Sequence, residues 1–320
     1  MIIIHHILLR GGGVRKLEQG VFVQSDLLYV LINSFVICAV DVFFIISGYF
    51  QIKFDLAKIF KILFSVYVIY DCIYLCNILN ERMAISYLDI KNLLFPITKF
   101  WFIYVYIVLS MLATYINKVL YHLSNNDIAR IVGIFFVLYC LYNFLLNDRV
   151  MCVNNGYSLH YAVFLYVLGT FIRRMEVFKF TRKTFYLLFF VGFSSLNCLW
   201  VYFSLVQGNY SFAWHLFSYN NPLVLLAAIS LFQFFRHINC SFMSKYIIRK
   251  MSKYILYVYI FHSSGPFFHK LIQFFLSVKS NNTIVGIFSI VLLSIMVLLI
   301  GIAVGYIFEK IYVHLLRLGR

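Results

Sequence analysis

The sequence predicts an all-α fold: a polytopic integral membrane protein with about ten transmembrane helices, the first of them truncated. Two observations predict this fold class. Of the 320 residues, 63% are hydrophobic and only 12% are charged, a composition that soluble globular proteins do not have. The apolar residues also come in repeated runs near the length of about 20 residues that crosses about 30 Å of hydrocarbon. A membrane β-barrel would show short alternating strands instead.

Ten apolar runs predict the helices in order along the chain. The first is too short to cross a bilayer, and we expect it to be the end of a span whose first half is missing from this chain. The predicted spans are 1–9, 28–50, 59–80, 100–117, 129–147, 157–173, 184–206, 219–235, 254–276 and 283–309. Because no internal repeat and no linker is visible, we expect a single membrane domain over residues 1–320.

Local sequence signals mark some boundaries within this pattern. The asparagines and the proline of 220–222 open the eighth span, as a helix cap followed by a first-turn proline does. In the ninth span, residues 263–266 read Ser-Ser-Gly-Pro and predict a local loosening of the helix. Backbone broken at membrane depth normally faces protein or a wet cavity.

The basic residues indicate the orientation of the spans. If the first span runs outward, 18 of the 27 Lys and Arg residues fall on the cytoplasmic side and 9 outside, as the positive-inside rule requires. Both termini are then cytoplasmic. Richness in Ile, Phe, Tyr, Lys and Asn is typical of an AT-rich bacterial genome. Together with the apolar runs and the distribution of cations, it fits our expectation of a multi-pass protein of the bacterial cytoplasmic (inner) membrane. The cations are scattered between apolar runs, which argues against binding of nucleic acid.

Two histidines and one aspartate lie within the first two apolar runs. The stretch MIIIHH places His5 and His6 side by side, and an imidazole can take a proton from a hydroxyl at neutral pH and return it later. The alternative is an interfacial pair at headgroup depth. Asp41 opens DVFFIISGYF, where a carboxylate either holds a basic partner on another helix or supports a catalytic site. Gly48, on the same predicted helical stripe, would let a neighbouring backbone approach closely.

Further candidates lie in the later spans and in the inner loops. His262 is another histidine well within a span. Two inner loops, 173–183 and 245–253, are rich in cations, which the positive-inside bias explains, yet an anionic cofactor with several phosphates would bind such a surface. The candidate cofactor-binding residues are Arg173, Arg174, Arg249 and Lys250. No metal site is expected, because Cys72 and Cys76 have no second Cys or His pair nearby.

Four motifs together resemble the acyltransferase 3 family, bacterial membrane enzymes that O-acetylate surface polysaccharides and related glycans. MIIIHH, followed by a glycine-bearing loop, resembles the histidine motif of the first span in that family. VDVFFIISGYF (40–50) resembles its second-span signature, FWFIYVYIVL (100–109) its Trp-Phe-x-x-x-Tyr span, and VYIFH (258–262) its late segment. The family pattern has a basic residue eleven positions before the histidine, which here would lie before Met1.

The resemblance implies an O-acetyltransferase that takes acetyl-CoA (acyl-CoA) from the cytoplasm as a co-substrate, with no permanently bound cofactor. It implies that His6 activates the acceptor hydroxyl, that His5 or Asp41 helps to orient it, and that His262 lies near the site. The implied partners are acyl-CoA, a cell-surface polysaccharide or its lipid-linked glycan precursor, and the lipid bilayer. Two alternatives stay open: a transporter or flippase of a lipid-linked glycan, and an inactive truncated relative.

Overall fold

The computed structural model describes residues 1–81, 86–146, 152–175, 182–239, 241–279 and 283–318. Within these ranges every regular element is helical and no strand occurs, which confirms the predicted all-α fold class. The chain forms two compact units. Unit 1 comprises Met1–Phe54 and Val105–Ile238, and unit 2 comprises Asp55–Tyr104 and Asn239–Arg320, with the boundary inside helix α6. The single domain over residues 1–320 stays a prediction.

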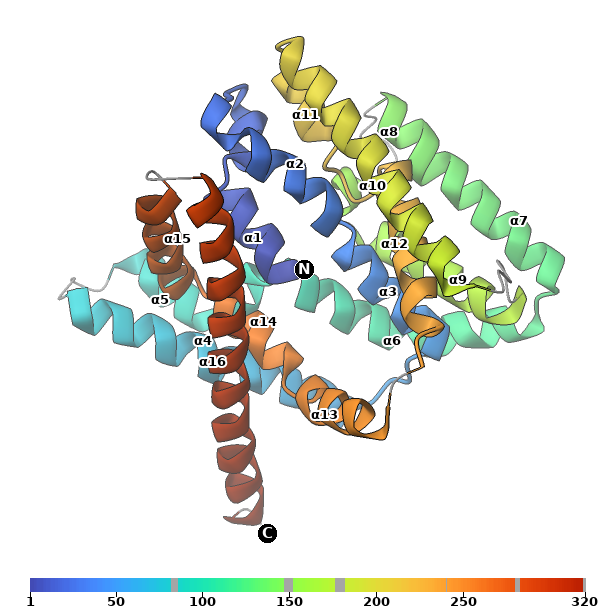
Figure 1. Cartoon of the computed structure of the whole chain (residues 1–320). Helices are drawn as coiled ribbons and strands as arrows, with labels where there is room; N and C mark the ends of the chain where they lie inside the picture. Colours follow the sequence, from blue (N-terminus) through green and yellow to red (C-terminus); the bar gives the residue numbers. More distant parts are fainter. Residues whose placement is uncertain (82–85, 147–151, 176–181, 240, 280–282, 319–320) are drawn as a thin grey trace. The chain divides into compact units, whose positions relative to one another are not determined.

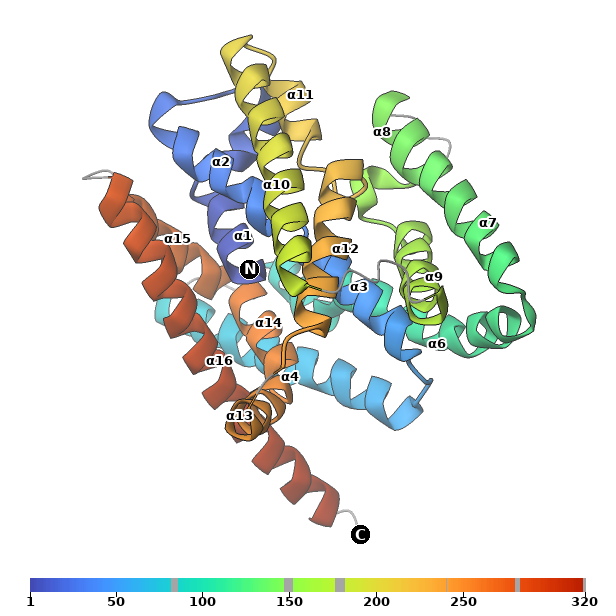
Figure 2. The same ribbon diagram turned by 45° about the vertical axis from the view of Figure 1, so that its right-hand side comes forward.

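Unit 1 is built from helices of both halves of the chain. α3 packs along α9, and α10 packs along α12 and α2 (Figures 1 and 2). Short 3₁₀ segments η1 (Val14–Gln19), η2 (Gln24–Asp26) and η5 (Asn154–Gly156) lie in its loops, and the π-helical segment η4 (Phe136–Tyr142) joins α7 to α8. Its helices are α1 (Ile2–Arg10), α2 (Leu27–Val36), α3 (Ala39–Phe50), most of α6 (Trp101–His122), α7 (Asn125–Phe135), α8 (Asn143–Leu146), α9 (Leu159–Met175), α10 (Lys183–Val206), α11 (Tyr210–His215) and α12 (Pro222–Arg236).

Unit 2 is organised around the long helix α16. α14 packs against α16 because two glycines of α16 admit it: a Cβ at Gly301 would stand 2.7 Å from Cα of Val258, and one at Gly305 would stand 2.5 Å from the ring of Tyr257. Its helices are α4 (Leu56–Glu81), α5 (Tyr87–Leu94), the 3₁₀ segment η3 (Pro96–Lys99), the first turn of α6, α13 (Phe242–Ser252), α14 (Ile255–Ser263), α15 (Gly265–Lys279) and α16 (Thr283–Leu318).

All ten predicted apolar runs are helical over most of their described residues, but they differ in length. In the part of the chain that the structure describes, six helical segments are long and apolar enough to cross a membrane, and the chain is an integral multi-pass membrane protein. The other predicted spans are α1, α9 and α12, which are shorter, and the run 254–276, which is divided into α14 and α15. The six long segments are Gln24–Phe50, Leu56–Asn80, Trp101–His122, Asn125–Leu146, Lys183–Val206 and Ile284–Leu315.

The predicted loosening of the ninth span is confirmed as a break. α14 ends at Ser263, Ser264 has extended backbone (φ −65°, ψ 118°), and α15 begins at Gly265. The side chain of Ser264 donates to the carbonyl oxygen of Ile260 at 2.8 Å, so a hydroxyl occupies an acceptor at the end of α14.

The close approach predicted at Gly48 is confirmed where α3 crosses α9. A Cβ at Gly48 would overlap the carbonyl oxygen of Tyr166, and one at Gly169 would overlap that of Ile45. Thr170 uses this proximity, because its Oγ1 donates to the carbonyl oxygen of Gly48 at 3.0 Å. Small residues that bring backbones together are typical of helix pairs in lipid. This crossing fixes α3, and with it Asp41, against α9.

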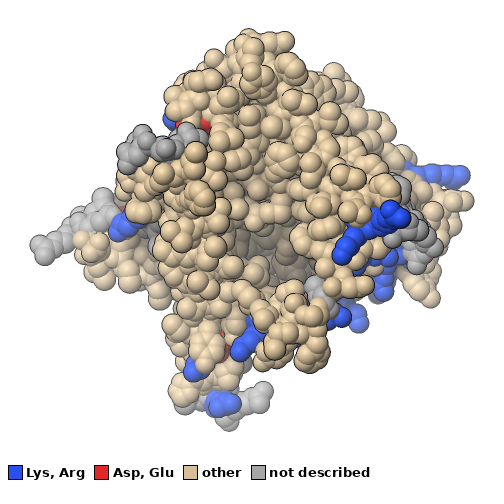
Figure 3. Space-filling model, in the orientation of Figure 1, with Lys and Arg blue, Asp and Glu red and all other residues tan. Residues whose placement is uncertain are grey.

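Charged side chains take up only a small part of the molecular face shown in Figure 3. Figure 3 shows a face that is mostly tan, with the blue Lys and Arg atoms in separate groups and very few red acidic atoms. Many large apolar side chains are exposed, among them Leu196, Phe203 and Leu292. Such a surface suits lipid as its surroundings.

Candidate active site

His5 is held inside unit 1 by a hydrogen bond to α2. Its side chain is buried, and Nδ1 lies 2.7 Å from the amide oxygen Oδ1 of Asn33. An amide oxygen only accepts, so Nδ1 carries the proton and Nε2 carries the lone pair. Nε2 lies 3.4 Å from the hydroxyl of Tyr219. His5 therefore presents a basic nitrogen toward a hydroxyl group in a buried position.

Tyr219 connects His5 to the predicted site residue Asp41. The hydroxyl of Tyr161, on α9, lies 2.8 Å from the carbonyl oxygen of Tyr219 and 3.3 Å from Oδ2 of Asp41. A hydroxyl has one proton to donate, and the shorter distance favours the carbonyl. All three side chains are buried. The structure thus places His5 and Asp41 in one polar network, which we call the His5 network: His5, Asn33, Tyr219, Tyr161 and Asp41.

The backbone of Tyr219 is fixed by the asparagines that follow it. Asn221 caps α12, because its Oδ1 accepts from the backbone N–H of Leu223 at 2.9 Å, as the sequence predicts for this helix start. Its Nδ2 also donates to Oδ1 of Asn197 at 2.9 Å. Asn220 donates to Oδ1 of Asn143 at 2.9 Å. Side chains of α8 and α10 therefore hold the segment that carries Tyr219.

Three of the buried polar atoms that have no hydrogen-bond partner among the described residues belong to side chains without any exposed surface. They are Nδ2 of Asn33, Oδ1 of Asp41 and Oδ1 of Asn220, and all three residues are 0% exposed. Leaving a buried donor or acceptor unpaired costs about 1–3 kcal/mol. Such atoms are common where a ligand or a reacting group completes the site.

His6 lies beside this network. Its side chain is half-buried, and its ring centroid lies 5.7 Å from that of His5. Adjacent helical residues point about 100° apart, so the side chain of His6 leaves α1 in a different direction from that of His5.

His262 belongs to unit 2 and is bound within its own helix. Its Nδ1 donates to the carbonyl oxygen of Val258, one turn earlier in α14, at 2.8 Å. The ring is buried and makes edge contacts with Tyr259 and Phe268. These contacts hold the imidazole where α14 ends, just before the break at Ser264.

Arg173 and Arg174 line a basic pocket of about 480 Å³ in unit 1. Arg173 donates to the carbonyl oxygen of Tyr49 at 3.3 Å, and Arg174 to that of Leu123 at 3.2 Å. Within the described residues, no ion pair includes either arginine or Lys118, so no acidic side chain of this part of the chain neutralises their charges. We call this space the α6–α9 pocket. Its lining residues are Gln51, Asn117, Lys118, Tyr121, His122, Arg173 and Arg174.

The α6–α9 pocket brings together the ends of three helices that the sequence places on the predicted cytoplasmic side. Gln51 follows α3, Lys118 and His122 end α6, and the arginines end α9. Asn117 joins them, because it donates to the carbonyl oxygen of Ile52 and accepts from the hydroxyl of Tyr166. Cations are favourable at helix C-termini, and here several of them face one space.

Arg249 and Lys250 lie on α13, which has no buried residue. Phe242, Met243 and Ile247 of the same helix are exposed as well. The structure therefore places these two cations on an open helix surface in unit 2, whereas Arg173 and Arg174 line a pocket.

Sequence reasoning missed Asn33, Tyr161 and Tyr219. Asn33 carried a signal, because it is a polar side chain inside the apolar run 28–50, eight residues before Asp41. The tyrosines carried none by residue type, since the chain has 25 of them. Lys118 and His122 were also missed as pocket residues, because only the fold brings the end of α6 to the end of α9.

These features define a helical membrane protein with a buried polar network around a histidine. The model of the acyltransferase 3 family, described as an acyltransferase domain, matches residues 1–306 and thus extends over both units. The chain belongs to the acyltransferase 3 family and is an acyltransferase, which confirms the predicted family and argues against the transporter alternative. No curated protein and no solved structure matches the chain.

Proposed function

We propose that this acyltransferase moves an acetyl group from acetyl-CoA to a hydroxyl of a cell-surface polysaccharide or its lipid-linked precursor, in the bacterial cytoplasmic membrane. The family match supports acyl transfer as the reaction. The identity of the acyl donor and that of the acceptor glycan are our proposal. The single observation that carries the mechanism is the buried contact of His5 with Asn33 and Tyr219.

His5 is the general base of this proposal, in place of its neighbour His6. The Asn33 oxygen keeps the proton on Nδ1, so Nε2 is ready to accept another. The hydroxyl of Tyr219 lies next to Nε2 and is the group that donates this proton. Proton removal by a placed imidazole contributes typically about 10²–10⁴-fold to a reaction rate.

In the proposed transfer step, the proton of the acceptor hydroxyl reaches His5 through Tyr219. The acceptor hydroxyl gives its proton to the oxygen of Tyr219 while Tyr219 gives its own proton to Nε2 of His5. The acceptor oxygen attacks the thioester carbonyl carbon, the carbon–sulfur bond breaks, and the leaving thiolate takes the proton back from the imidazolium. The Asn33 amide stays on the Nδ1 side of His5, where its oxygen stabilises the imidazolium that forms.

Asp41 is a positioning residue in this mechanism. It contacts Tyr161, and Tyr161 holds the carbonyl oxygen of Tyr219. The crossing of α3 and α9 at Gly48 sets the distance between Asp41 and Tyr161. Loss of Asp41 would act on Tyr219 through Tyr161.

The α6–α9 pocket is the proposed site for the nucleotide end of acyl-CoA. Its arginines and Lys118, which form no ion pair within the described residues, suit phosphates, since arginine–phosphate hydrogen bonds are short and frequently bidentate. Gln51 and Asn117 border the same space, and Oε1 of Gln51 accepts a hydrogen bond from Arg173 at 3.4 Å. Arg249, Lys250 and His262 remain predicted site residues in unit 2, and the proton transfer above does not require them.

The proposal is tested in a bacterial strain that lacks its own copy of the gene. The strain receives the full chain, the His5→Gln variant or an empty vector, and ester-linked acetyl is measured on purified surface glycan. We expect acetyl esters only in the strain that receives the unchanged full chain. Membranes of that strain should also transfer label from radioactive acetyl-CoA to the glycan. If glycan acetylation is the same with the full chain and the empty vector, although the protein is in the membrane, the proposed acceptor class is wrong.

A further inference from the structure

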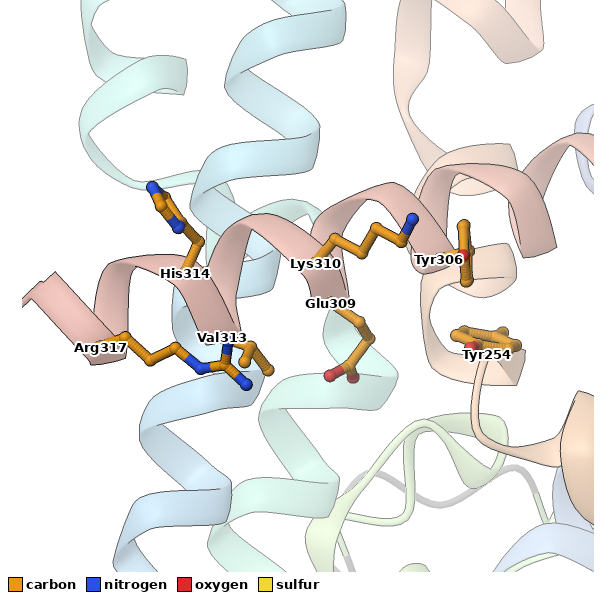
Figure 4. Close-up of a pocket in the computed structure, with 7 residues that line it drawn as sticks. All are labelled: Tyr254, Tyr306, Glu309, Lys310, Val313, His314 and Arg317. Carbon is orange, nitrogen blue, oxygen red and sulfur yellow. The ribbon is translucent and has the colours of Figure 1, made fainter.

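A second pocket, of about 430 Å³, lies in unit 2 along the last turns of α16. Most of its lining residues recur at intervals of three and four, so they form one stripe of the helix. Tyr254 comes from the junction between α13 and α14 (Figure 4). We call this space the α16 pocket. Its lining residues are Tyr254, Tyr306, Glu309, Lys310, Val313, His314 and Arg317.

The acidic residue of the α16 pocket is already neutralised. Both carboxylate oxygens of Glu309 contact Nζ of Lys61, at 2.7 and 2.8 Å, and the hydroxyl of Tyr257 donates to Oε1. Lys310 lies over the ring of Tyr306, with Nζ 4.7 Å from its centroid. Among the described residues, no ion pair includes Lys310 or Arg317. The pocket therefore retains positive charge.

The length of α16 allows this charge to lie outside the hydrocarbon. The helix has 36 residues, or roughly 54 Å at about 1.5 Å per residue, whereas the hydrocarbon core is about 30 Å thick. The predicted apolar span ends at residue 309. The last turns of α16, which carry Lys310 and Arg317, then reach the headgroup layer or pass beyond it.

An apolar track leads along α16 to this pocket. Four exposed apolar side chains, Phe288, Leu292, Ile295 and Leu299, recur at intervals of four, three and four residues. Further steps of three or four residues, through 303 and 313 or 314, reach Tyr306, Lys310 and then Arg317. One stripe of the helix is thus apolar over several turns and cationic at its end, which is the order of groups along an anionic phospholipid.

We infer that the α16 pocket binds the phosphodiester headgroup of an anionic phospholipid whose acyl chains lie along the exposed stripe of α16. Arg317 and Lys310 donate to the phosphate oxygens. The rings of Tyr254 and Tyr306, which lie 6.5 Å apart, border the glycerol portion, as tyrosines at a membrane interface do. α13, which ends at Ser252 just before Tyr254, adds exposed cations to the same layer. This inference does not depend on the identity of the acyl acceptor.

The test measures lipid binding to the purified full chain by native mass spectrometry in detergent. Phosphatidylglycerol and phosphatidylcholine are titrated separately against the wild type and against the double variant Lys310→Gln/Arg317→Gln. A control removes the same charge on the same predicted side of the membrane, through Lys53→Gln/Lys58→Gln, whose lysines are exposed and outside the pocket. Arg317→Gln alone serves if the double variant does not fold.

We expect the wild type and the control to bind phosphatidylglycerol about tenfold more tightly than phosphatidylcholine, and the pocket variant to lose most of that preference. A wild type without the preference would overturn the inference. An equal loss in the control and the pocket variant would do the same, because charge alone would then explain binding. A further arm adds glycerol phosphate: if it displaces phosphatidylglycerol at equal concentration, the pocket binds free phosphate and the lipid assignment is wrong.

Discussion

The Nδ1 nitrogen of His5 lies 2.7 Å from the amide oxygen of Asn33, and both side chains are buried. This contact decides which nitrogen of the imidazole is basic, because an amide oxygen accepts and cannot donate. It also distinguishes His5 from the adjacent His6, which the sequence motif alone does not do. The role of Asn33 is therefore the first consequence to test.

Replacing Asn33 by alanine removes the acceptor that fixes the His5 tautomer. We expect acyl transfer to fall by at least about tenfold, as a part of the contribution of the base. The matched control is Ser34→Ala, which removes a neighbouring buried hydroxyl without a partner among the described residues. Transfer rates at equal amounts of membrane protein check this prediction. Equal activity of the two variants would show that the tautomer of His5 does not matter.

Tyr219→Phe removes the hydroxyl next to Nε2 of His5 and keeps the ring. We expect the maximal rate to fall by about tenfold or more while the KM for acyl-CoA stays unchanged, because the hydroxyl moves a proton and does not bind the donor. Tyr202→Phe is the control, since Tyr202 is an exposed tyrosine of α10 in the same unit. The relay is refuted if Tyr219→Phe retains the full rate.

The α6–α9 pocket predicts an effect on the KM for the donor. Lys118→Gln/Arg174→Gln should raise the KM for acetyl-CoA by about tenfold or more, because charge-assisted hydrogen bonds contribute about 1.5–3 kcal/mol each. The KM for acetyl-pantetheine, which lacks the nucleotide, should not change. Arg130→Gln is the control, since Arg130 is exposed and pairs with Asp127 at 3.5 Å. An equal rise with both donors would contradict a phosphate site here.

The crossing of α3 and α9 predicts a difference between two glycines. At Gly48 a Cβ would overlap the carbonyl oxygen of Tyr166, whereas at Gly192, inside α10, it would meet no atom within 4 Å. Gly48→Ala should lower the free energy of unfolding by about 1–3 kcal/mol. Gly192→Ala should be neutral or stabilising by up to about 1 kcal/mol, because alanine favours the helix. Thermal unfolding in detergent compares them, and equal melting temperatures would show that the crossing tolerates a methyl group.

Asp89, in α5, predicts a dependence of stability on pH. Hydrogen bonds from Ser86, and from the hydroxyl of Tyr74 at 2.6 Å, hold the pKa of this carboxyl below its ordinary value. A lowered pKa contributes stability above the unfolded-state pKa of about 3.9, and the contribution is lost as the pH falls through the folded-state value. The stability of the wild type relative to Asp89→Asn should therefore shrink below about pH 4. A constant difference from pH 3 to pH 7 would contradict this.

The sequence predicts the helices of the fold better than the residues of the site. The helices and the break after Ser263 follow from apolar runs and from a Ser-Ser-Gly-Pro stretch, which are local signals. The division of the run 28–50 into α2 and α3 at residues 37–38 carries no glycine or proline signal. His5 and Asp41 stood out because titratable groups in an apolar run are costly. Tyr219 did not, because its role depends on a contact with a residue 214 positions away.

The most direct test of this account is the rate of labelled acetyl transfer by His5→Gln and His6→Gln, measured in proteoliposomes that contain equal amounts of folded protein. The two substitutions make the same chemical change at adjacent positions of α1, so each controls for the other. The account predicts that His5→Gln lowers the rate by about 10²–10⁴-fold and that His6→Gln lowers it by no more than a few-fold. Loss of transfer in His6→Gln with retention in His5→Gln would contradict it.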